Sequence, residues 1–458
     1  MQPAVGQGRN LIAAPSALAP GCSVNARDHL CSADCDLVEL VAEFGTPLYV
    51  FNEPVIRERC RQWREAFRDY AGGADVAYAA KAGLTLALAR LISQEDLHLD
   101  VVSGGELFVA LRAGMPAARI HVHGNNKPPQ EIAEALDAGV GRFVVDNFDE
   151  LAALEREAAH RHRRQAILLR VAPGIEAHTH DYIRTGSQAS KFGFDLQTGQ
   201  ALEAARRAEA SPHLHLMGLH AHIGSQILDV SAVTPLVATM LDLWARMASV
   251  LGRPLEELNL GGGAGIRYAG ERTLPPAEVA EAMGRAVTDG CAERGLPLPR
   301  LAVEPGRSIV GEAGVALYTV GTQKHIPGLV SYVAVDGGMG DNIRPALYGA
   351  EYTVVLANRM SAPPSAAVHV VGRYCESGDF LARGALLPAL EAGDLLAFYS
   401  AGAYQYPMAS NYNLVPRPCV LLVEGGRAHV MVARETYADL IARDRLPAHL
   451  LPEDSARA

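Results

Sequence analysis

From residue 47 to residue 307 the chain alternates short apolar runs with longer segments whose apolar residues recur at helical spacing. This alternation is typical of βα units, which build a parallel sheet. The apolar runs cover 75–81, 98–103, 119–125, 142–147, 165–171, 214–223, 256–262 and 300–306. The first seven are each followed by a helical pattern, such as 128–139 or 230–252, and another helix is predicted at 53–71. Eight strands and eight helices predict a closed (β/α)₈ barrel of the TIM type.

After residue 310 the strand-like runs continue without long helices between them, which predicts an all-β domain, a small barrel or a sandwich. Gly425 and Gly426 separate two of these runs and indicate a hairpin turn. We therefore expect a flexible N-terminal extension at 1–35, the barrel at 36–310 and the β domain at 311–458. The strand predicted at 47–51 could belong to either domain.

Composition narrows the possible functions. Of the 458 residues, 49% are hydrophobic and 20% are charged, which fits a folded chain with a large core. No apolar stretch approaches the roughly 18 residues of a transmembrane helix. The net charge of −10 argues against a nucleic-acid partner. Seven irregularly spaced cysteines fit reduced thiols, so we expect a cytoplasmic protein.

Every predicted barrel strand ends in polar or glycine residues. In a barrel these ends meet at one face, where active sites form. The residues concerned are Lys81, Asp100, Ser103, His123, Asn125, Asp146, Arg170, His222, Ser225, Gly261, Gly262, Gly263, Glu304 and Arg307.

The glycine run 261–263 could be a tight turn or a phosphate cradle. Its place after the seventh strand favours the cradle, with Gly306 and Arg307 in the next loop. Lys81 ends an apolar strand, where burial would leave a neutral, nucleophilic amine, although a salt-bridged lysine is an equal alternative. A phosphate site beside such a lysine points to pyridoxal phosphate bound as a Schiff base.

The motifs at these positions resemble the alanine-racemase-like barrel family of pyridoxal-phosphate enzymes (fold type III), and within it the diaminopimelate decarboxylases. The resemblance runs from about residue 45 to residue 440. It rests on YAAKAG, DVVSGGEL, HGNNK, HAHIGSQ, LNLGGGAG and EPGRSIV in the first domain, and on DGGMGDNIRPALYGA, CESGD and GAYQYPMASNYN in the second.

The resemblance implies a role for each matching cofactor residue. Lys81 would carry the cofactor, and His222 would stack on its ring. The phosphate would be held by Ser225, Gly261, Gly262, Gly263 and Tyr404, with Gly306 and Arg307 in the adjoining loop. Glu304 would face the pyridine nitrogen. A carboxylate there keeps that nitrogen protonated and the ring strongly electron-withdrawing, which favours decarboxylation over racemisation.

The resemblance also implies a substrate and an assembly. Arg307, Arg344, Tyr348 and Tyr404 would bind the substrate, the two arginines and Tyr348 holding its distal carboxylate. Cys375 would reprotonate Cα, and Glu376 would pair with the distal ammonium, from a loop that crosses a homodimer interface. The implied reaction converts meso-2,6-diaminopimelate into L-lysine and CO₂, the last step of lysine biosynthesis.

Several departures from the family pattern keep other readings open. Gly83 replaces a usual asparagine, LVPRP follows NYN, and Gln405 and Pro407 are uncommon in their segment. The substrate could therefore be ornithine, lysine or a carrier-bound glutamate. A non-catalytic regulatory homologue is the alternative of another class, although it would not need Lys81, Glu304 and Cys375 together.

Two further patterns carry minor expectations. Four His-x-His pairs lack the additional ligands that would complete a metal shell, so no metal is predicted. The polar segment 178–194 is long for a βα loop and is a candidate lid over the active site.

Overall fold

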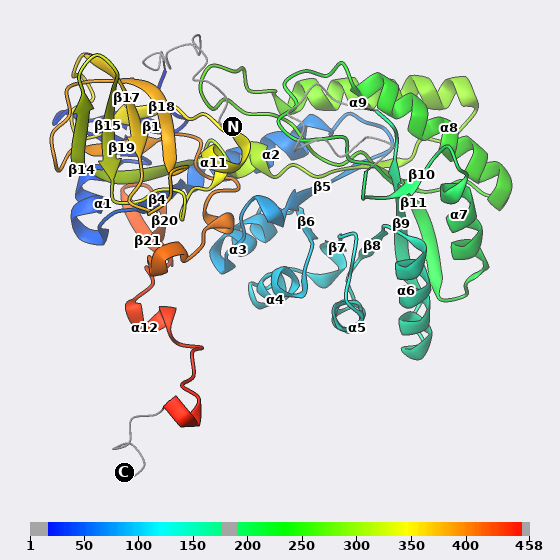
Figure 1. The fold of residues 1–458 in the computed structure, drawn as a ribbon. Helices are drawn as coiled ribbons and strands as arrows, with labels where there is room; N and C mark the ends of the chain where they lie inside the picture. Colours follow the sequence, from blue (N-terminus) through cyan, green and yellow to red (C-terminus); the bar gives the residue numbers. More distant parts are fainter. Residues whose placement is uncertain (1–16, 176–189, 451–458) are drawn as a thin grey trace.

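The computed structural model describes residues 17–175 and 190–450. Figure 1 shows a barrel surrounded by helices on one side and a β-rich domain on the other. The last described residues, up to residue 450, run away from both.

Eight parallel strands close the barrel, as the sequence predicts. They are β5 (Ala74–Ala79), β6 (His98–Val101), β7 (Ile120–Val122), β8 (Arg142–Val145), β9 (Gln165–Ala172), β11 (Leu214–His220), β12 (Glu257–Asn259) and β13 (Arg300–Val303). Pairing of β13 with β5 and of β8 with β9 completes the circle. A two-residue strand, β10 (Phe194–Asp195), adds to the edge of β9.

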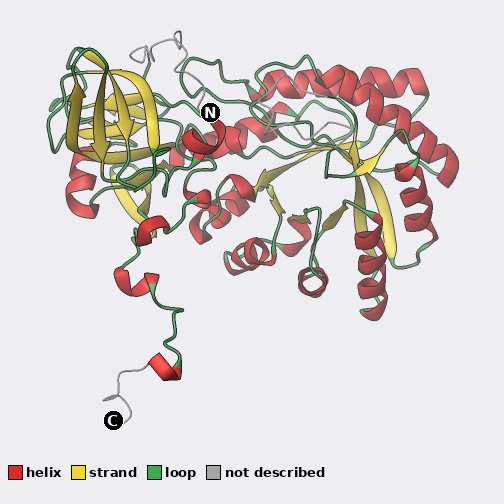
Figure 2. Cartoon of the chain, viewed as in Figure 1, coloured by secondary structure: helices red, strands yellow, loops and turns green. Residues whose placement is uncertain are grey.

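Helices cover the outside of the barrel (Figure 2). They are α2 (Glu53–Ala66), α3 (Leu86–Gln94), α4 (Gly104–Arg112), α5 (Pro129–Ala138), α6 (Phe148–His160), α7 (Gln200–Ala210), α8 (Val233–Leu251), α9 (Pro276–Arg294) and the short α10 (Arg307–Val310). Their apolar faces pack on the strands, and Trp244 of α8 is fully buried there. Within the described ranges, no helix has the length and apolarity needed to cross a membrane.

The second domain is a sheet of mixed direction. Its strands are β4 (Leu48–Asn52), β14 (Gly314–Ile326), β15 (Val330–Val335), β16 (Val354–Leu356), β17 (Ala366–Val371), β18 (Phe380–Leu387), β19 (Leu395–Phe398), β20 (Cys419–Glu424) and β21 (Arg427–Val432). β4 lies between β14 and β20, so the strand near 47–51 belongs to this domain. Gly425 and Gly426, both at positive φ, turn the chain from β20 into β21.

Residues 17–44 differ from the sequence expectation, which assigned 17–35 to a flexible extension and 36–44 to the barrel. They form β1 (Cys22–Val24), β2 (Leu30–Ser32), β3 (Cys35–Asp36) and α1 (Leu37–Phe44). Leu30 and Leu37 are fully buried in one cluster with Leu48 of β4 and Val315 of β14. This segment packs on the β domain because it supplies apolar side chains to that domain's core.

Two short helices complete the second domain: α11 (Arg344–Tyr348), after β15, and α12 (Tyr437–Leu440), in the C-terminal segment. The first of them faces the barrel rim, where it contributes to the site described next.

Candidate active site

A cavity of about 490 Å³ lies where the carboxyl ends of the barrel strands meet the second domain. Eleven of the residues singled out in the sequence line it: Lys81, His222, Ser225, Gly262, Gly263, Glu304, Gly306, Arg307, Arg344, Tyr348 and Tyr404. Gly261, next to Gly262 in the sequence, does not line it. The cavity therefore brings together side chains that are more than 300 residues apart in the sequence, from Lys81 to Tyr404.

Lys81 follows β5 in a short 3₁₀ turn (Ala80–Ala82), and its Nζ lies 3.1 Å from Oδ2 of the buried Asp100. Burial alone would lower the pKa of Lys81, but Asp100, Tyr404 and Glu304 together outweigh it, so the pKa is raised above its ordinary value. Of the two alternatives that the sequence left open for Lys81, the structure shows the salt-bridged lysine. The sequence placed Asp100 at the rim but did not predict that it pairs with Lys81.

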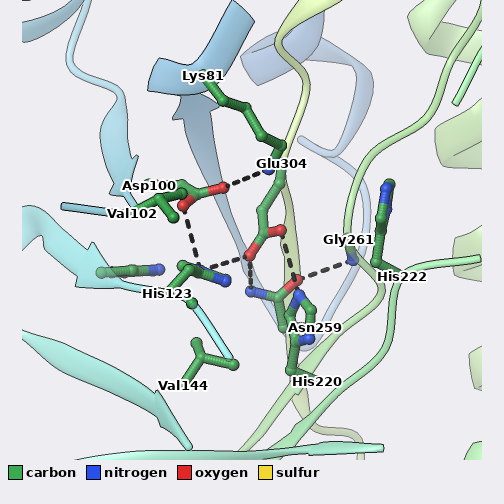
Figure 3. Close-up of polar contacts among 12 residues, drawn as sticks. Lys81, Asp100, Val102, His123, Val144, His220, His222, Asn259, Gly261 and Glu304 are labelled. Atoms are coloured by element: carbon green, nitrogen blue, oxygen red, sulfur yellow. Dashed lines mark hydrogen bonds and ion pairs between the residues drawn. The ribbon is translucent and has the colours of Figure 1, made fainter. Parts of the chain in front are cut away.

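Glu304 follows β13 and lies at the centre of a buried hydrogen-bonded network (Figure 3). One of its oxygens, Oε1, lies 3.1 Å from Nε2 of His123 and accepts a 2.8 Å hydrogen bond from Nδ2 of Asn259. The other, Oε2, lies 3.2 Å from Nε2 of His220. Burial would raise the pKa of Glu304, but the two histidines lower it well below its ordinary value, so the group is a carboxylate.

His222 lines the cavity and follows His220 of this network closely along the chain. Burial first, and then the positive charges of Lys81 and Arg170, hold the pKa of His222 well below its ordinary value. Its Nδ1 accepts a hydrogen bond from the backbone N–H of Gly262, 3.3 Å away. The ring is thus neutral and oriented, as a side chain that stacks on a flat ligand must be.

The glycine loop comes too close to its neighbours to admit side chains. A Cβ on Gly262 would lie 2.1 Å from the carbonyl oxygen of Glu304, and one on Gly263 would lie 2.4 Å from that of Gly224. Gly261 and Gly263 also have φ of +70° and +114°. Bare backbone beside a cavity allows N–H groups to approach an anion. Together with a rim lysine and a buried carboxylate, this donor set fits pyridoxal phosphate.

Two arginines also line the cavity. The Arg307 guanidinium donates to Oγ of Ser225 at 2.8 Å and to the hydroxyl of Tyr268, and its Cζ lies 4.7 Å from the ring centroid of Tyr404. Arg344, at the start of α11, donates to the hydroxyl of Tyr352. Among residues 17–175 and 190–450, neither arginine has an acidic partner within 4.0 Å.

Cys375 and Glu376 do not line the cavity of their own chain. Both are exposed. Their loop is held in place, because Oδ1 of Asp379 accepts from the N–H of Met339 at 2.7 Å and Oδ2 accepts from that of Tyr374 at 2.8 Å.

Two other rim residues, Ser103 and Arg170, make contacts within the protein that the sequence did not predict. The Ser103 hydroxyl accepts from the N–H of Glu106 and begins α4 as its N-cap. Arg170 lies 3.8 Å from Asp146. The candidate lid lies mostly at residues 176–189, outside the described residues.

Sequence reasoning missed several residues of the site. Tyr268, Glu271 and Glu351 line the cavity, and His220 and Asn259 support Glu304 from beneath. The last two were detectable as polar residues inside otherwise apolar strands. Tyr268, Glu271 and Glu351 do not follow the end of a predicted barrel strand, so no comparable signal marked them.

His123, His220 and Glu304 are also residue types that bind metals, and their candidate ligand atoms lie within 4.8 Å of one another. In this structure those atoms face one another at hydrogen-bonding distance. The contacts of both histidines with Glu304 therefore explain why these three side chains lie together (Figure 3).

Comparisons with known proteins agree with this geometry. Residues 54–311 match the family described as "Pyridoxal-dependent decarboxylase, pyridoxal binding domain". Diaminopimelate decarboxylase of Bacillus subtilis is 47% identical over 424 residues, covering 92% of this chain and 96% of the relative. The Mycobacterium tuberculosis (H37Rv) enzyme of the same name is 44% identical over 423 residues, covering 90% and 94%.

A solved structure shows the same fold. The crystal structure of diaminopimelate decarboxylase from M. jannaschii in complex with L-lysine superposes with a TM-score of 0.89 at 34% identity, over 94% of this chain and 99% of that one. The cofactor of this protein is accordingly pyridoxal phosphate. By sequence, fold and site, the chain belongs to the diaminopimelate decarboxylase family of pyridoxal-dependent decarboxylases.

Proposed function

We propose that the protein decarboxylates meso-2,6-diaminopimelate to L-lysine and CO₂. The observation that carries this substrate is the pair Arg307 and Arg344, two cavity guanidinium groups without an acidic partner among the described residues. Guanidinium forks match a carboxylate in geometry and charge. The names of the relatives, diaminopimelate decarboxylases at 44–47% identity, support the same substrate.

The cofactor residues divide the chemistry among them. When bound, pyridoxal phosphate supplies a ring that takes up the electron pair left as CO₂ departs. Lys81 holds the cofactor covalently, and Asp100 keeps its amine in place. Glu304, an ionised carboxylate, holds a proton on the pyridine nitrogen. The glycine loop, Ser225 and Tyr404 bind the phosphate, and His222 orients the ring.

The arginine pair separates diaminopimelate from simpler amino acids. Ornithine and lysine end in a bare amine, which would place a cation beside two buried guanidinium groups. The departures from the family pattern do not reach the cavity, because Gly83, Gln405 and Pro407 are not among its lining residues. A Cβ on Gly83 would lie 3.6 Å from Cγ of Pro407, so these two departures lie close together.

We also propose a homodimer in which Cys375 and Glu376 complete the partner's site. In their own chain both are exposed and stand outside the cavity, yet their loop is held by buried Asp379. A rigid, exposed loop with an acid and a thiol is suited to insertion into a neighbouring site. There Cys375 would deliver a proton to Cα of the product, and Glu376 would pair with the distal ammonium.

The seven cysteines are all unpaired. Free thiols at this number are typical of a reducing compartment, which supports a cytoplasmic location.

The test is to follow both products from meso-diaminopimelate with the holoenzyme. We expect CO₂ and L-lysine in equal amounts, and neither from Lys81→Ala. A matched control is Lys324→Ala, because Lys324 lies on the exposed part of β14. Absence of CO₂ from meso-diaminopimelate with the cofactor bound would contradict the proposal and favour the regulatory homologue.

A further inference from the structure

The carboxylate of Glu304 is held by side chains from the ends of three barrel strands (Figure 3). His123 follows β7, His220 ends β11 and Asn259 ends β12. A carboxylate oxygen only accepts hydrogen bonds, so His220 carries its proton on Nε2 and donates it to Oε2 of Glu304 at 3.2 Å. Nε2 of His123 faces the other oxygen, Oε1, at 3.1 Å.

The third donor has a fixed orientation. Oδ1 of Asn259 accepts a 2.8 Å hydrogen bond from the N–H of Gly261, which leaves the amide NH₂ to face Glu304. This bond links the glycine loop of the phosphate site to the carboxylate. A shift in the loop would therefore move the donor on Glu304.

The two histidines also brace each other. Their rings pack edge to face with centroids 5.1 Å apart, and the residues are only 4% and 1% exposed. His123 further lies 3.6 Å from Oδ1 of Asp100, the partner of Lys81. A buried carboxylate without such donors would tend to take up a proton, and it would then no longer pair with a protonated ring nitrogen.

We propose that His123 and His220 are positioning residues that hold Glu304 ionised and aimed at the pyridine nitrogen of the cofactor. Neither histidine lines the cavity, so both act through Glu304. The inference rests on the cofactor role of Glu304 in the proposed function. It does not depend on which amino acid is decarboxylated.

The experiment compares the affinity of the apoprotein for pyridoxal phosphate with its affinity for the analogue that has carbon in place of the ring nitrogen. Only the natural cofactor can pair with Glu304, so the wild type is expected to prefer it by about tenfold or more, as for a charge-assisted hydrogen bond. In His220→Leu and His123→Leu the preference is expected to fall severalfold toward unity. In Glu304→Leu, which has no group that can pair with the ring nitrogen, the preference should be lost, and adding His220→Leu to that variant should change it no further.

His220→Gln and His123→Gln retain an N–H donor and are expected to keep most of the preference. If the leucine variants bind pyridoxal phosphate and the carbon analogue more weakly by the same factor, the histidines have a purely structural role and the proposal is overturned. Where a leucine variant does not fold, the glutamine variant at the same position is the test. A folded glutamine variant that loses the preference for pyridoxal phosphate would also contradict the proposal. Because no amino-acid substrate is present, a wrong substrate assignment leaves this result unaffected.

Discussion

Arg307 and Arg344 lie against the same aromatic ring, with their Cζ atoms 5.6 Å and 5.1 Å from the centroid of Tyr268. Tyr268 in turn packs edge to face with Tyr352, whose hydroxyl accepts from Arg344. Aromatic contacts hold both guanidinium groups without neutralising them. This arrangement leaves two fixed positive charges for an anionic group of the ligand.

The first prediction concerns Arg344. In Arg344→Gln, kcat/KM for meso-diaminopimelate is expected to fall by about 10–100-fold, mainly through KM, because a charged hydrogen bond to the distal carboxylate is lost. Arg344→Lys should be only partly active, since an ammonium cannot form the same fork. The control is Arg246→Gln, at an exposed position of α8. Steady-state kinetics that show an unchanged KM in Arg344→Gln would remove this residue from substrate binding.

The second prediction concerns the glycine loop. Gly262→Ala places a methyl group 2.1 Å from the Glu304 carbonyl oxygen, which forces the loop to move. We expect pyridoxal phosphate to bind at least about tenfold more weakly, since N–H groups that hold an anion act only at close range. Gly270→Ala is the matched control, because a Cβ there meets nothing within 4 Å. Titration of the apoprotein with cofactor measures both, and equal affinities would argue against a phosphate site at Gly262.

The third prediction tests the shared site. Lys81→Ala and Cys375→Ala should each be nearly inactive as homodimers. When the two are mixed and allowed to exchange subunits, half of the dimers become hybrids with one intact site, which restores about a quarter of wild-type turnover for a two-fold dimer. If each site is built within one chain, mixing restores nothing.

The fourth prediction concerns pH. Burial raises the pKa of Asp341 to about 7, although the Tyr318 hydroxyl donates to its Oδ2 at 2.6 Å. Between the ordinary carboxyl pKa and pH 7 the folded chain holds a proton that the unfolded chain has released. The free energy of unfolding contributed by this group therefore falls as pH rises through that window, by at most about 4 kcal/mol.

Asp341→Asn removes this titration, so its melting temperature relative to wild type is expected to rise between pH 5 and pH 8. If the melting temperatures of the two proteins instead change with pH in parallel across that range, Asp341 is ionised throughout in the folded chain.

The barrel and most of its rim followed from the sequence because parallel strands leave a periodic apolar signal and end on one face. Lys81, His222, Glu304 and Arg307 are found at the cavity for that reason. Residues 17–44 were misplaced because Cys22 to Asp36 is rich in small and polar residues and shows no clear alternation. Their place in the fold depends on contacts with β4 and β14, far along the chain.

The interior of the site was harder to predict than its rim. The pairing of Lys81 with Asp100 is a contact between adjacent strands, and it reverses the effect that burial alone has on the lysine. The ring of Tyr268 contacts both arginines. Tyr268 lies in a loop and does not follow the end of a predicted strand, so the sequence did not mark it. Such contacts depend on how individual side chains of adjacent strands and of the second domain meet, which a local pattern does not encode.

The most direct test of the account is the ratio of kcat/KM for meso-diaminopimelate to that for L-lysine and L-ornithine, measured as CO₂ release by one holoenzyme preparation. A site built for a distal carboxylate should favour meso-diaminopimelate by at least about 10³-fold, because the other two leave its buried charges unpaired. Comparable or faster release of CO₂ from lysine or ornithine would contradict the assignment of Arg307 and Arg344 to the substrate carboxylate.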